Sequence, residues 1–233
     1  CSPHNPVGRV WTHDELDRIG RICRAHDVLV ISDEIHADFT YPGHRHHVFP
    51  TVDPSFAERC VVCTAPSKTF NIAGLQIANI VIPNEELRTR YRKALERIGY
   101  FGASPLSLET CRSCYTHGGP WLDELKDYLA ENLRFLRNFL SERMPEIALV
   151  EPQGTYLAWL DCSGLGLDDA RLEELMVDDA HVWLDSGSMF GPRSGQFERV
   201  NIACPRATLE RALEQIESAV GKVRAQRAAN RKR

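Results

Sequence analysis

The chain has 233 residues, of which 43% are hydrophobic and 26% are charged. This length and composition are typical of a globular protein built from one large domain or two small ones. No apolar run is long enough to cross a bilayer. With 28 basic and 32 acidic residues the formal net charge is −4, which excludes a general attraction to nucleic acid or to anionic lipid.

The first half of the chain predicts helices that alternate with short apolar strands. The pattern Thr12-His-Asp-Glu15 has the form of a capping box and starts a helix that ends near His26. Asn84 caps a second helix over residues 85–98. Continuous apolar runs, typical of strands covered on both faces, occupy residues 28–31, 60–63 and 77–82. The alternation predicts a parallel α/β layer.

The second half begins with a long amphipathic helix over residues 121–143, in which leucines recur at helical spacing. Past Pro145 the spacing predicts strands and helices that form a smaller α+β layer. The strands are expected at residues 147–150, 155–160, 182–184 and 200–203, and the helices at 169–177 and from Thr208 onward. The predicted division is residues 1–119, an interdomain helix over 120–145, and a small C-terminal domain over 146–233.

Eight cysteines raise the alternatives of a disulfide framework, a metal site or free thiols. Two pairs have the C-x-x-C spacing of zinc ligands: Cys60 with Cys63, and Cys111 with Cys114. Residues three apart in a strand point to opposite faces, so Cys60 and Cys63 are poorly placed to bind one ion. Neither pair lies beside a glycine or proline turn. The pattern favours free thiols in a reducing cytoplasm over a zinc site.

Two motifs follow predicted strands directly. Ser32-Asp33-Glu34-Ile35-His36 comes after the run 28–31, and the segment 65–74, which contains Lys68, comes after the run 60–63. Ligands of open α/β sheets bind at the carboxyl ends of strands. The small and apolar surroundings of Lys68 predict a partly desolvated amine that can serve as a nucleophile, whereas a solvated surface lysine is the alternative.

Two further motifs are informative because of where they lie in the chain. Asn5-Pro-Val-Gly8 predicts a turn, and it precedes Asp33 by one helix and one strand. Arg199-Val-Asn opens a strand of the second half, and an arginine suits bidentate binding of a carboxylate. A surface salt bridge is the alternative role for Arg199.

In this order the motifs resemble the pyridoxal 5'-phosphate enzymes of the aspartate aminotransferase fold, and more narrowly the MalY/PatB-type cystathionine β-lyases, or C–S lyases. The resemblance implies an α/β fold with a mostly parallel sheet in a partial large domain (residues 1–119) and a smaller α+β domain. The phrases that carry the narrower match are Ser32-Asp-Glu-Ile-His36, Ser67-Lys-Thr-Phe-Asn-Ile72, Gly119-Pro-Trp-Leu122, Thr155-Tyr-Leu-Ala-Trp-Leu160 and Cys204-Pro-Arg206.

Carried over position by position, the resemblance implies a role for each motif residue. Lys68 holds the cofactor covalently and then removes the substrate α-proton. Asp33 pairs with the pyridine nitrogen, so that the ring stores the electrons of the carbanion. Asn5 hydrogen-bonds the phenolic oxygen of the ring, and His36 lies near that oxygen. Arg199 binds the substrate α-carboxylate.

The phosphate site departs from the pattern of many aminotransferases of this fold. Where they carry a hydroxyl residue three positions before the lysine and an arginine eight after it, this chain has Ala65 and Gln76. Ser67 and Thr64 are the remaining local hydroxyls, and Ser67 is the candidate for the phosphate. No metal ligand is implied.

The resemblance implies a C–S β-lyase that converts L-cystathionine or related cysteine thioethers to a thiol, pyruvate and ammonia. An aminotransferase acting on amino acids with the same residues is the alternative. A third hypothesis is a partner-binding role, supported by six basic residues and no acid over residues 222–233.

Family members carry a further domain's length ahead of the Asn-Pro-x-Gly turn, so the chain is expected to be the C-terminal portion of a longer cytoplasmic protein. Enzymes of this fold are generally homodimers with the active site at the subunit boundary. Residues 99–106, which include Tyr100 and Phe101, are the candidate for part of that boundary.

Overall fold

The computed structural model of the chain describes residues 1–230. It consists of two compact units, each with its own sheet. The first unit holds residues 1–5, 9–126 and 153–155, and the second holds residues 6–8, 127–152 and those from 156 onward. The boundary falls inside helix α6 (Gly119–Arg143). The three-part division made from the sequence stays a prediction.

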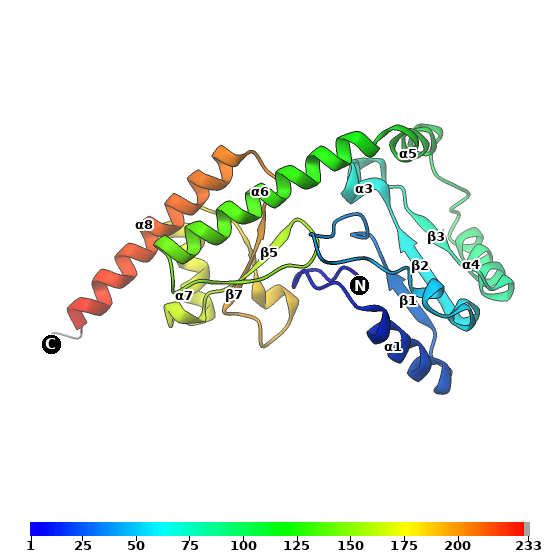
Figure 1. The fold of residues 1–233 in the computed structure, drawn as a ribbon, viewed down its shortest axis with the longest axis horizontal. Coiled ribbons are helices and arrows are strands. Elements are labelled where there is room, and N and C mark those ends of the chain that lie inside the picture. The colour runs from blue at the N-terminus through cyan, green and yellow to red at the C-terminus, as the bar shows by residue number, and fades with distance from the viewer. Residues whose placement is uncertain (231–233) are drawn as a thin grey trace. The chain divides into compact units, whose positions relative to one another are not determined.

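The first unit has a three-stranded sheet in the order β1-β2-β3 (Figure 1). Its strands are β1 (Val30–Asp33), β2 (Cys60–Thr64) and β3 (Asn79–Val81). β1 and β2 are parallel, with Asp33 opposite Cys63, while β2 and β3 are antiparallel. Within the described residues this sheet is therefore mixed, with one parallel pairing.

Several helices of the first unit begin directly after a capping residue. The helices are α1 (His13–Ala25), α2 (Phe49–Val52), α3 (Pro66–Thr69), α4 (Glu85–Arg97) and α5 (Pro105–His117), with 3₁₀ turns η1 (Pro54–Arg59) and η2 (Ala73–Leu75). The capping box of Thr12 and Glu15 is formed, and Asn84 accepts a hydrogen bond from the Leu87 N–H. These two predicted helices are confirmed. The sequence analysis missed α5, which Ser104 caps.

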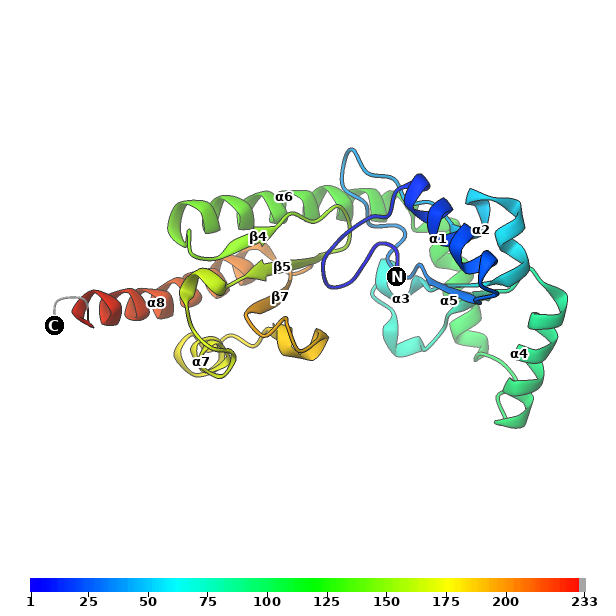
Figure 2. The same ribbon diagram turned by 90° about the horizontal axis from the view of Figure 1, so that it is seen from below.

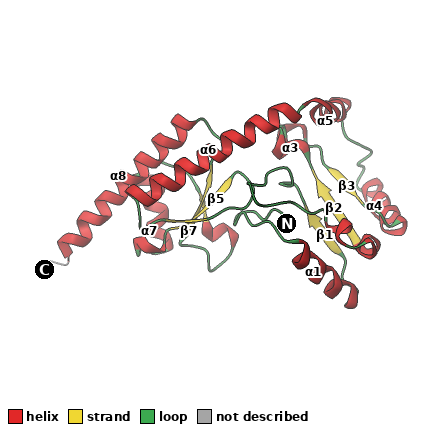
Figure 3. Ribbon diagram, in the orientation of Figure 1, coloured by secondary structure: helices red, strands yellow, loops and turns green. Residues whose placement is uncertain are grey.

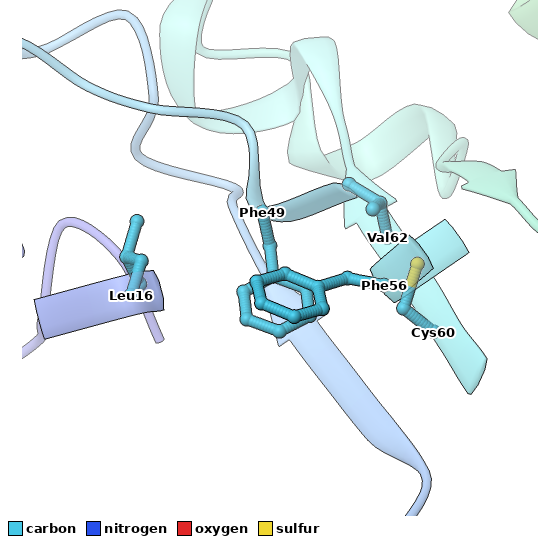
Figure 4. Packing of buried hydrophobic residues seen from close by; sticks show 5 residues of the cluster. All are labelled: Leu16, Phe49, Phe56, Cys60 and Val62. Carbon is cyan, nitrogen blue, oxygen red and sulfur yellow. The ribbon is translucent and has the colours of Figure 1, made fainter. Parts of the chain in front are cut away.

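One face of the first sheet is covered by α1, α2 and η1, which contact one another. Figure 2 shows α1 and α2 side by side. The buried cluster between them consists of Leu16, Phe49, Phe56, Cys60 and Val62 (Figure 4). The rings of Phe49 and Phe56 stack with centroids 5.4 Å apart. Gly20 of α1 lies so close to Phe56 that a Cβ there would meet the ring at 2.2 Å. Any larger residue at position 20 would therefore push α1 off the cluster.

The prediction of a strand at 28–31 covered on both faces is wrong for this chain. The strand begins at Val30 and ends at Asp33, and Ile31 is 65% exposed. Val28 and Leu29 lie before the strand and are exposed as well. The described helices cover the face that carries Val30, so the alternate residue Ile31 points away from that cover.

The second unit contains a four-stranded antiparallel sheet in the order β4-β5-β7-β6. Its strands β5 and β7 are labelled in Figure 3. Its strands are β4 (Ala148–Val150), β5 (Leu157–Asp161), β6 (Asp185–Ser186) and β7 (Phe197–Asn201). The predicted strand at 182–184 is wrong, because the chain pairs with β7 only at Asp185 and Ser186. The other three strands of this half are confirmed, with bounds shifted by one to three residues.

The core of the second unit lies under two long helices. These are α6 and α8 (Arg206–Asn230). The shorter helical elements of the unit are α7 (Asp169–Glu174), the 3₁₀ turns η3 (Ser163–Leu165) and η5 (Gly187–Phe190), and the π-helical turn η4 (Leu175–Asp179). The predicted leucine stripe of α6 is buried at Leu129, Leu133, Leu136 and Leu140. Within residues 1–230 no helix is long and apolar enough to span a membrane.

The basic residues near the C-terminus are partly engaged in the fold. Arg224 of α8 donates two hydrogen bonds to the carboxylate of Glu146, at 2.6 and 2.7 Å. The basic residues Arg231, Lys232 and Arg233 lie outside the described residues. The partner-binding hypothesis for residues 222–233 stays a prediction.

Candidate active site

Asp33 is the last residue of β1, at the carboxyl end where ligands of α/β sheets bind. Its Oδ1 accepts a hydrogen bond from the Ile35 N–H at 3.2 Å, and its backbone carbonyl accepts one from the Ser2 N–H at 2.9 Å. The thiol of Cys63 on β2 has a raised pKa, first through burial and then through the carboxylates of Asp33 and Glu34. This strand end therefore carries a negative potential that suits a positively charged group.

Glu34 follows Asp33 and is buried, with a side chain only 1% exposed. Its carboxylate accepts three hydrogen bonds: from the Ser32 hydroxyl at 2.9 Å, from the Phe49 N–H at 3.0 Å and from Nε2 of His46 at 2.8 Å. Ser32 belongs to β1, whereas His46 and Phe49 belong to the segment that returns to the sheet. Glu34 therefore fastens the segment 37–48 to the strand end that carries Asp33.

His46 is a residue that the sequence analysis missed. It lies outside the Ser32–His36 motif, and the only signal in the sequence is the histidine-rich run His44-Arg-His-His47. Which residue of that run returns to β1 depends on the path of the loop, and spacing alone does not determine it.

Lys68 lies on the short helix α3, directly after β2. The next residue, Thr69, is fully buried and its hydroxyl donates to Oδ2 of Asp38 at 2.6 Å. Since Asp38 belongs to the segment after β1, this bond ties α3 to the strand end that carries Asp33. Lys68 itself is exposed, so the predicted desolvation of its amine is wrong for the chain as described. The neighbouring residues Ala65, Pro66 and Thr69 are buried, but the side chain of Lys68 is not covered by them.

The far end of α3 is held by aromatic packing. The ring of Phe70 lies edge-on to Tyr115 and tilted against Trp121, with centroids 6.0 and 5.9 Å apart. Gly118 permits this arrangement, because a Cβ there would meet the Phe70 ring at 2.3 Å. The rings fix where α3 ends and therefore restrict the position of Lys68.

The other predicted residues of the first unit lie near the same strand ends. His36 is buried three residues after Asp33, and the half-buried Ser67 precedes Lys68. Asn5 is half-buried and follows Ser2, whose N–H binds the carbonyl of Asp33. The fold thus gathers Asn5, Asp33, His36, Ser67 and Lys68 around the carboxyl ends of β1 and β2.

Arg199 lies in the second unit, on β7. Its Nε and Nη2 both donate to Oδ2 of Asp185, at 3.1 and 2.7 Å, and its guanidinium lies 4.8 Å from the centre of the Phe190 ring. Asp185 is on the neighbouring strand β6, directly opposite Arg199. The two residues hold the guanidinium in one orientation, and Asp185 was missed by the sequence analysis.

The segment after β7, which contains the Cys204-Pro-Arg206 motif, is held by Asn132 of α6. Asn132 is fully buried and donates to the carbonyls of Ile202 and Cys204, at 2.8 and 3.0 Å. Its Oδ1 accepts from Nε of Arg206 at 2.8 Å. Both amide hydrogens and one acceptor site of Asn132 are thus used to fix the exit of the strand that bears Arg199.

Within the described residues, the cysteine thiols form neither a disulfide nor a metal site. All eight cysteines are free, and burial raises the pKa of the Cys60 thiol to about 11. Over residues 1–230 no group of three or more His, Cys, Asp and Glu side chains is arranged to hold a metal ion.

Known proteins resemble the chain along almost its whole length. Cystathionine β-lyase PatB of Bacillus subtilis is 41% identical over 220 residues, and the protein MalY of Escherichia coli is 38% identical over 225. The alignments cover 94% and 96% of this chain. The chain spans 57% of the length of each of these relatives.

A solved structure also resembles the chain over almost its whole length. Cystalysin from Treponema denticola, whose structure contains pyridoxal 5'-phosphate, superposes with a TM-score of 0.93 at 39% identity, over 96% of this chain and 57% of that one. The expected aspartate aminotransferase-like fold is confirmed by this match. The family model for aminotransferase class I and II matches residues 1–216. The chain therefore belongs to the aminotransferase class I and II family.

Proposed function

We propose that the protein containing this chain is a pyridoxal phosphate-dependent C–S β-lyase, which cleaves L-cystathionine or related cysteine thioethers to a thiol, pyruvate and ammonia. The observation that carries the proposal is an amine and a carboxylate, Lys68 and Asp33, at the ends of two adjacent parallel strands. The name of the Bacillus subtilis relative supports the lyase over other reactions of the family.

The residues of the first unit fit the cofactor. Among residues 1–230, the amine of Lys68 and the Oδ2 of Asp33 have no hydrogen-bond or ion-pair partner, although each lies on an anchored element. A primary amine can bind an aldehyde covalently, and an aspartate can pair with a protonated pyridine nitrogen. These two groups are the donor set that pyridoxal phosphate requires.

When bound, the cofactor supplies a ring that withdraws electrons from the substrate α-carbon. Lys68 would hold the cofactor through its amine, and the same amine, when free, would take the substrate α-proton on Nζ. Asp33 keeps the pyridine nitrogen protonated, which strengthens the withdrawal of electrons. The electron pair left at Cα would form the Cα=Cβ bond as the Cβ–S bond breaks and sulfur leaves as a thiolate, and hydrolysis of the resulting enamine by water would give pyruvate and ammonia.

The remaining motif residues of each unit have proposed roles of their own. Asn5 donates its amide N–H to the phenolic oxygen of the ring, and His36 lies beside the same oxygen. Ser67 donates its hydroxyl to the phosphate. Arg199 binds the substrate α-carboxylate through two parallel N–H···O bonds, and Asp185 keeps the guanidinium plane in place.

Arg199→Ala in the full-length protein is expected to raise the KM for L-cystathionine about 10- to 100-fold with a smaller change in kcat, because it removes a charged bidentate contact. Initial rates over a range of substrate concentrations measure both constants. Arg134→Ala, which removes an exposed arginine of α6, is the control. An unchanged KM for the Arg199 variant would assign this residue to the salt bridge with Asp185 alone.

We also propose that the intact protein is a homodimer that acts on a small amino-acid substrate. Residues 99–106 support the dimer, since Phe101 is 89% exposed and the neighbouring Ile98 and Leu106 are exposed as well. Large apolar side chains gathered on one short segment are typical of an interface. Sedimentation of the full-length protein with and without Phe101→Asp tests the assignment, and a dimer unaffected by the change would remove this segment from the boundary.

The function is tested on the full-length protein with pyridoxal phosphate and L-cystathionine, in the absence of any keto acid. Pyruvate and free thiol are followed together. Release of both in equal amounts is the expected result. Turnover that begins only after a keto acid is added would identify an aminotransferase instead, because that reaction needs an amino-group acceptor.

A further inference from the structure

A pocket of about 130 Å³ opens within the second unit, at β6, β7 and the π-helical turn η4. Four of the seven residues that line it are apolar, and the other three are Glu173, Ser186 and Glu198. The apolar residues are Met176, Val177, Trp183 and Leu184. Neither the motifs nor the proposed reaction uses this pocket, and Glu198 is the residue that sets it apart.

Glu198 is a buried acid with no partner. It lies on β7 between Leu160 of β5 and Ser186 of β6, and it is 2% exposed. Within residues 1–230 its carboxylate makes no hydrogen bond or ion pair. Burial raises its pKa to about 7, with further contributions from the like charges of Glu173 and Asp185.

An ionised, unpaired carboxylate in a buried pocket destabilises a fold, unless it takes up a proton or a ligand supplies the opposite charge. The ionisable groups close to Glu198 are Glu173 of α7, Asp185 of β6 and Cys162 after β5. None of them carries a positive charge. The nearby Arg171 is already paired with Glu174 and Asp179, and it does not line the pocket. The pocket therefore carries a negative potential that is not balanced by a positive side chain of the described residues, as expected of a cation-binding site.

The shape and walls of the pocket select the kind of cation. Trp183 lines the pocket and is 89% exposed, so a face of its indole is open to a ligand. A guanidinium group is planar, stacks on aromatic rings and is more weakly hydrated than an ammonium, so it enters an apolar pocket at lower desolvation cost. Its fork also matches a carboxylate in two hydrogen bonds. A cavity of about 150 Å³ holds a benzene ring, so the volume here suits a guanidinium with a methylene or two.

We propose that this pocket binds a guanidinium group, carried either by a small molecule or by an arginine side chain, with Glu198 as the anion and Trp183 as the stacking surface. Only the ionised carboxylate binds. The affinity therefore falls as pH drops below the pKa of Glu198 and levels off above it. With that pKa at about 7, affinity is expected to rise about tenfold from pH 6 to pH 8.

Calorimetric titration of the full-length protein with methylguanidinium and with the peptide Gly-Gly-Arg-Gly-Gly tests the proposal and separates the two sources. Binding of methylguanidinium indicates a small guanidine, and binding of the peptide alone indicates an arginine of a partner. N-acetylcitrullinamide, an uncharged isostere of the arginine side chain, is expected not to bind. If neither cation binds at pH 8, the proposal is overturned.

Two variants assign the binding to the pocket. Glu198→Gln keeps the size of the side chain and removes the charge, and it is expected to weaken binding at pH 8 at least tenfold and to abolish the pH dependence. Glu210→Gln changes an exposed glutamate of α8 that does not line the pocket, and it is expected to leave affinity unchanged. Equal affinity in the Glu198 variant and the original protein would place the binding elsewhere and refute the proposal.

Discussion

Lys68→Ala in the full-length protein is expected to lower turnover of L-cystathionine by about a thousandfold or more. Two functions are lost together, namely the covalent attachment of the cofactor and the base that takes the α-proton. No other lysine of the first unit can take them over from its place, because Lys93 lies on α4 and Lys126 on α6. Release of pyruvate measures the loss, and the amount of cofactor that stays bound after dialysis measures the attachment separately.

The control is Lys93→Ala, which removes an exposed lysine of α4 and is expected to leave turnover unchanged. A small primary amine such as ethylamine is expected to restore part of the activity of the Lys68 variant, because it replaces the lost base. Retention of more than about a tenth of the original activity by the Lys68 variant would exclude both the lyase and the aminotransferase.

The elements that could be predicted are those whose signals are local. The capping box of Thr12 and Glu15 and the cap of Asn84 fix their helices within a few residues. Helix α5 was missed because its buried side consists of the small residues Ser107 and Cys111, while its large apolar residues Leu106 and Leu108 are exposed. A helix without an apolar stripe shows no periodicity, although Ser104 followed by Pro105 was a start signal.

The error at residues 182–184 has a similar origin. Val182, Trp183 and Leu184 form an apolar run, but the run lines pockets and leaves Trp183 exposed, while the paired strand is the polar Asp185 and Ser186. The apolar run predicts a strand buried in a sheet, but in the structure these residues line surface pockets. Such a difference depends on tertiary context, which a single sequence does not contain.

For the candidate site, the motifs located the residues that we propose to bind the cofactor and substrate, and the structure added residues that hold them in place. Asp33 and Lys68 could be found because each belongs to a polar motif that comes soon after an apolar run. Asp38 and His46 could not be found, because each lies in the segment after β1, and its hydrogen-bond partner depends on how that segment folds back against the sheet. Glu34 stood in the motif, but its burial and its three hydrogen bonds emerged only from the fold.

Glu34→Ala is therefore expected to lower the free energy of unfolding by about 3 kcal/mol, because it leaves the Phe49 N–H, the Ser32 hydroxyl and Nε2 of His46 without their buried acceptor. For a protein of this size the melting temperature falls by roughly 6–12 °C. Thermal unfolding of the cofactor-free protein measures the effect without reference to activity. Glu34→Gln, which keeps an oxygen for the Phe49 N–H, is expected to lose less than half as much.

The same variant tests whether Glu34 positions the site. Loosening the segment 37–48 frees Asp38, which fixes α3 through Thr69, so Glu34→Ala is expected to weaken cofactor binding as well as stability. Glu96→Ala, at an exposed position of α4, is the control for both measurements. A loss of stability with unchanged cofactor affinity would limit Glu34 to the fold. An unfolding free energy within about 0.5 kcal/mol of the original would contradict the buried hydrogen bonds themselves, since that range is typical of surface substitutions.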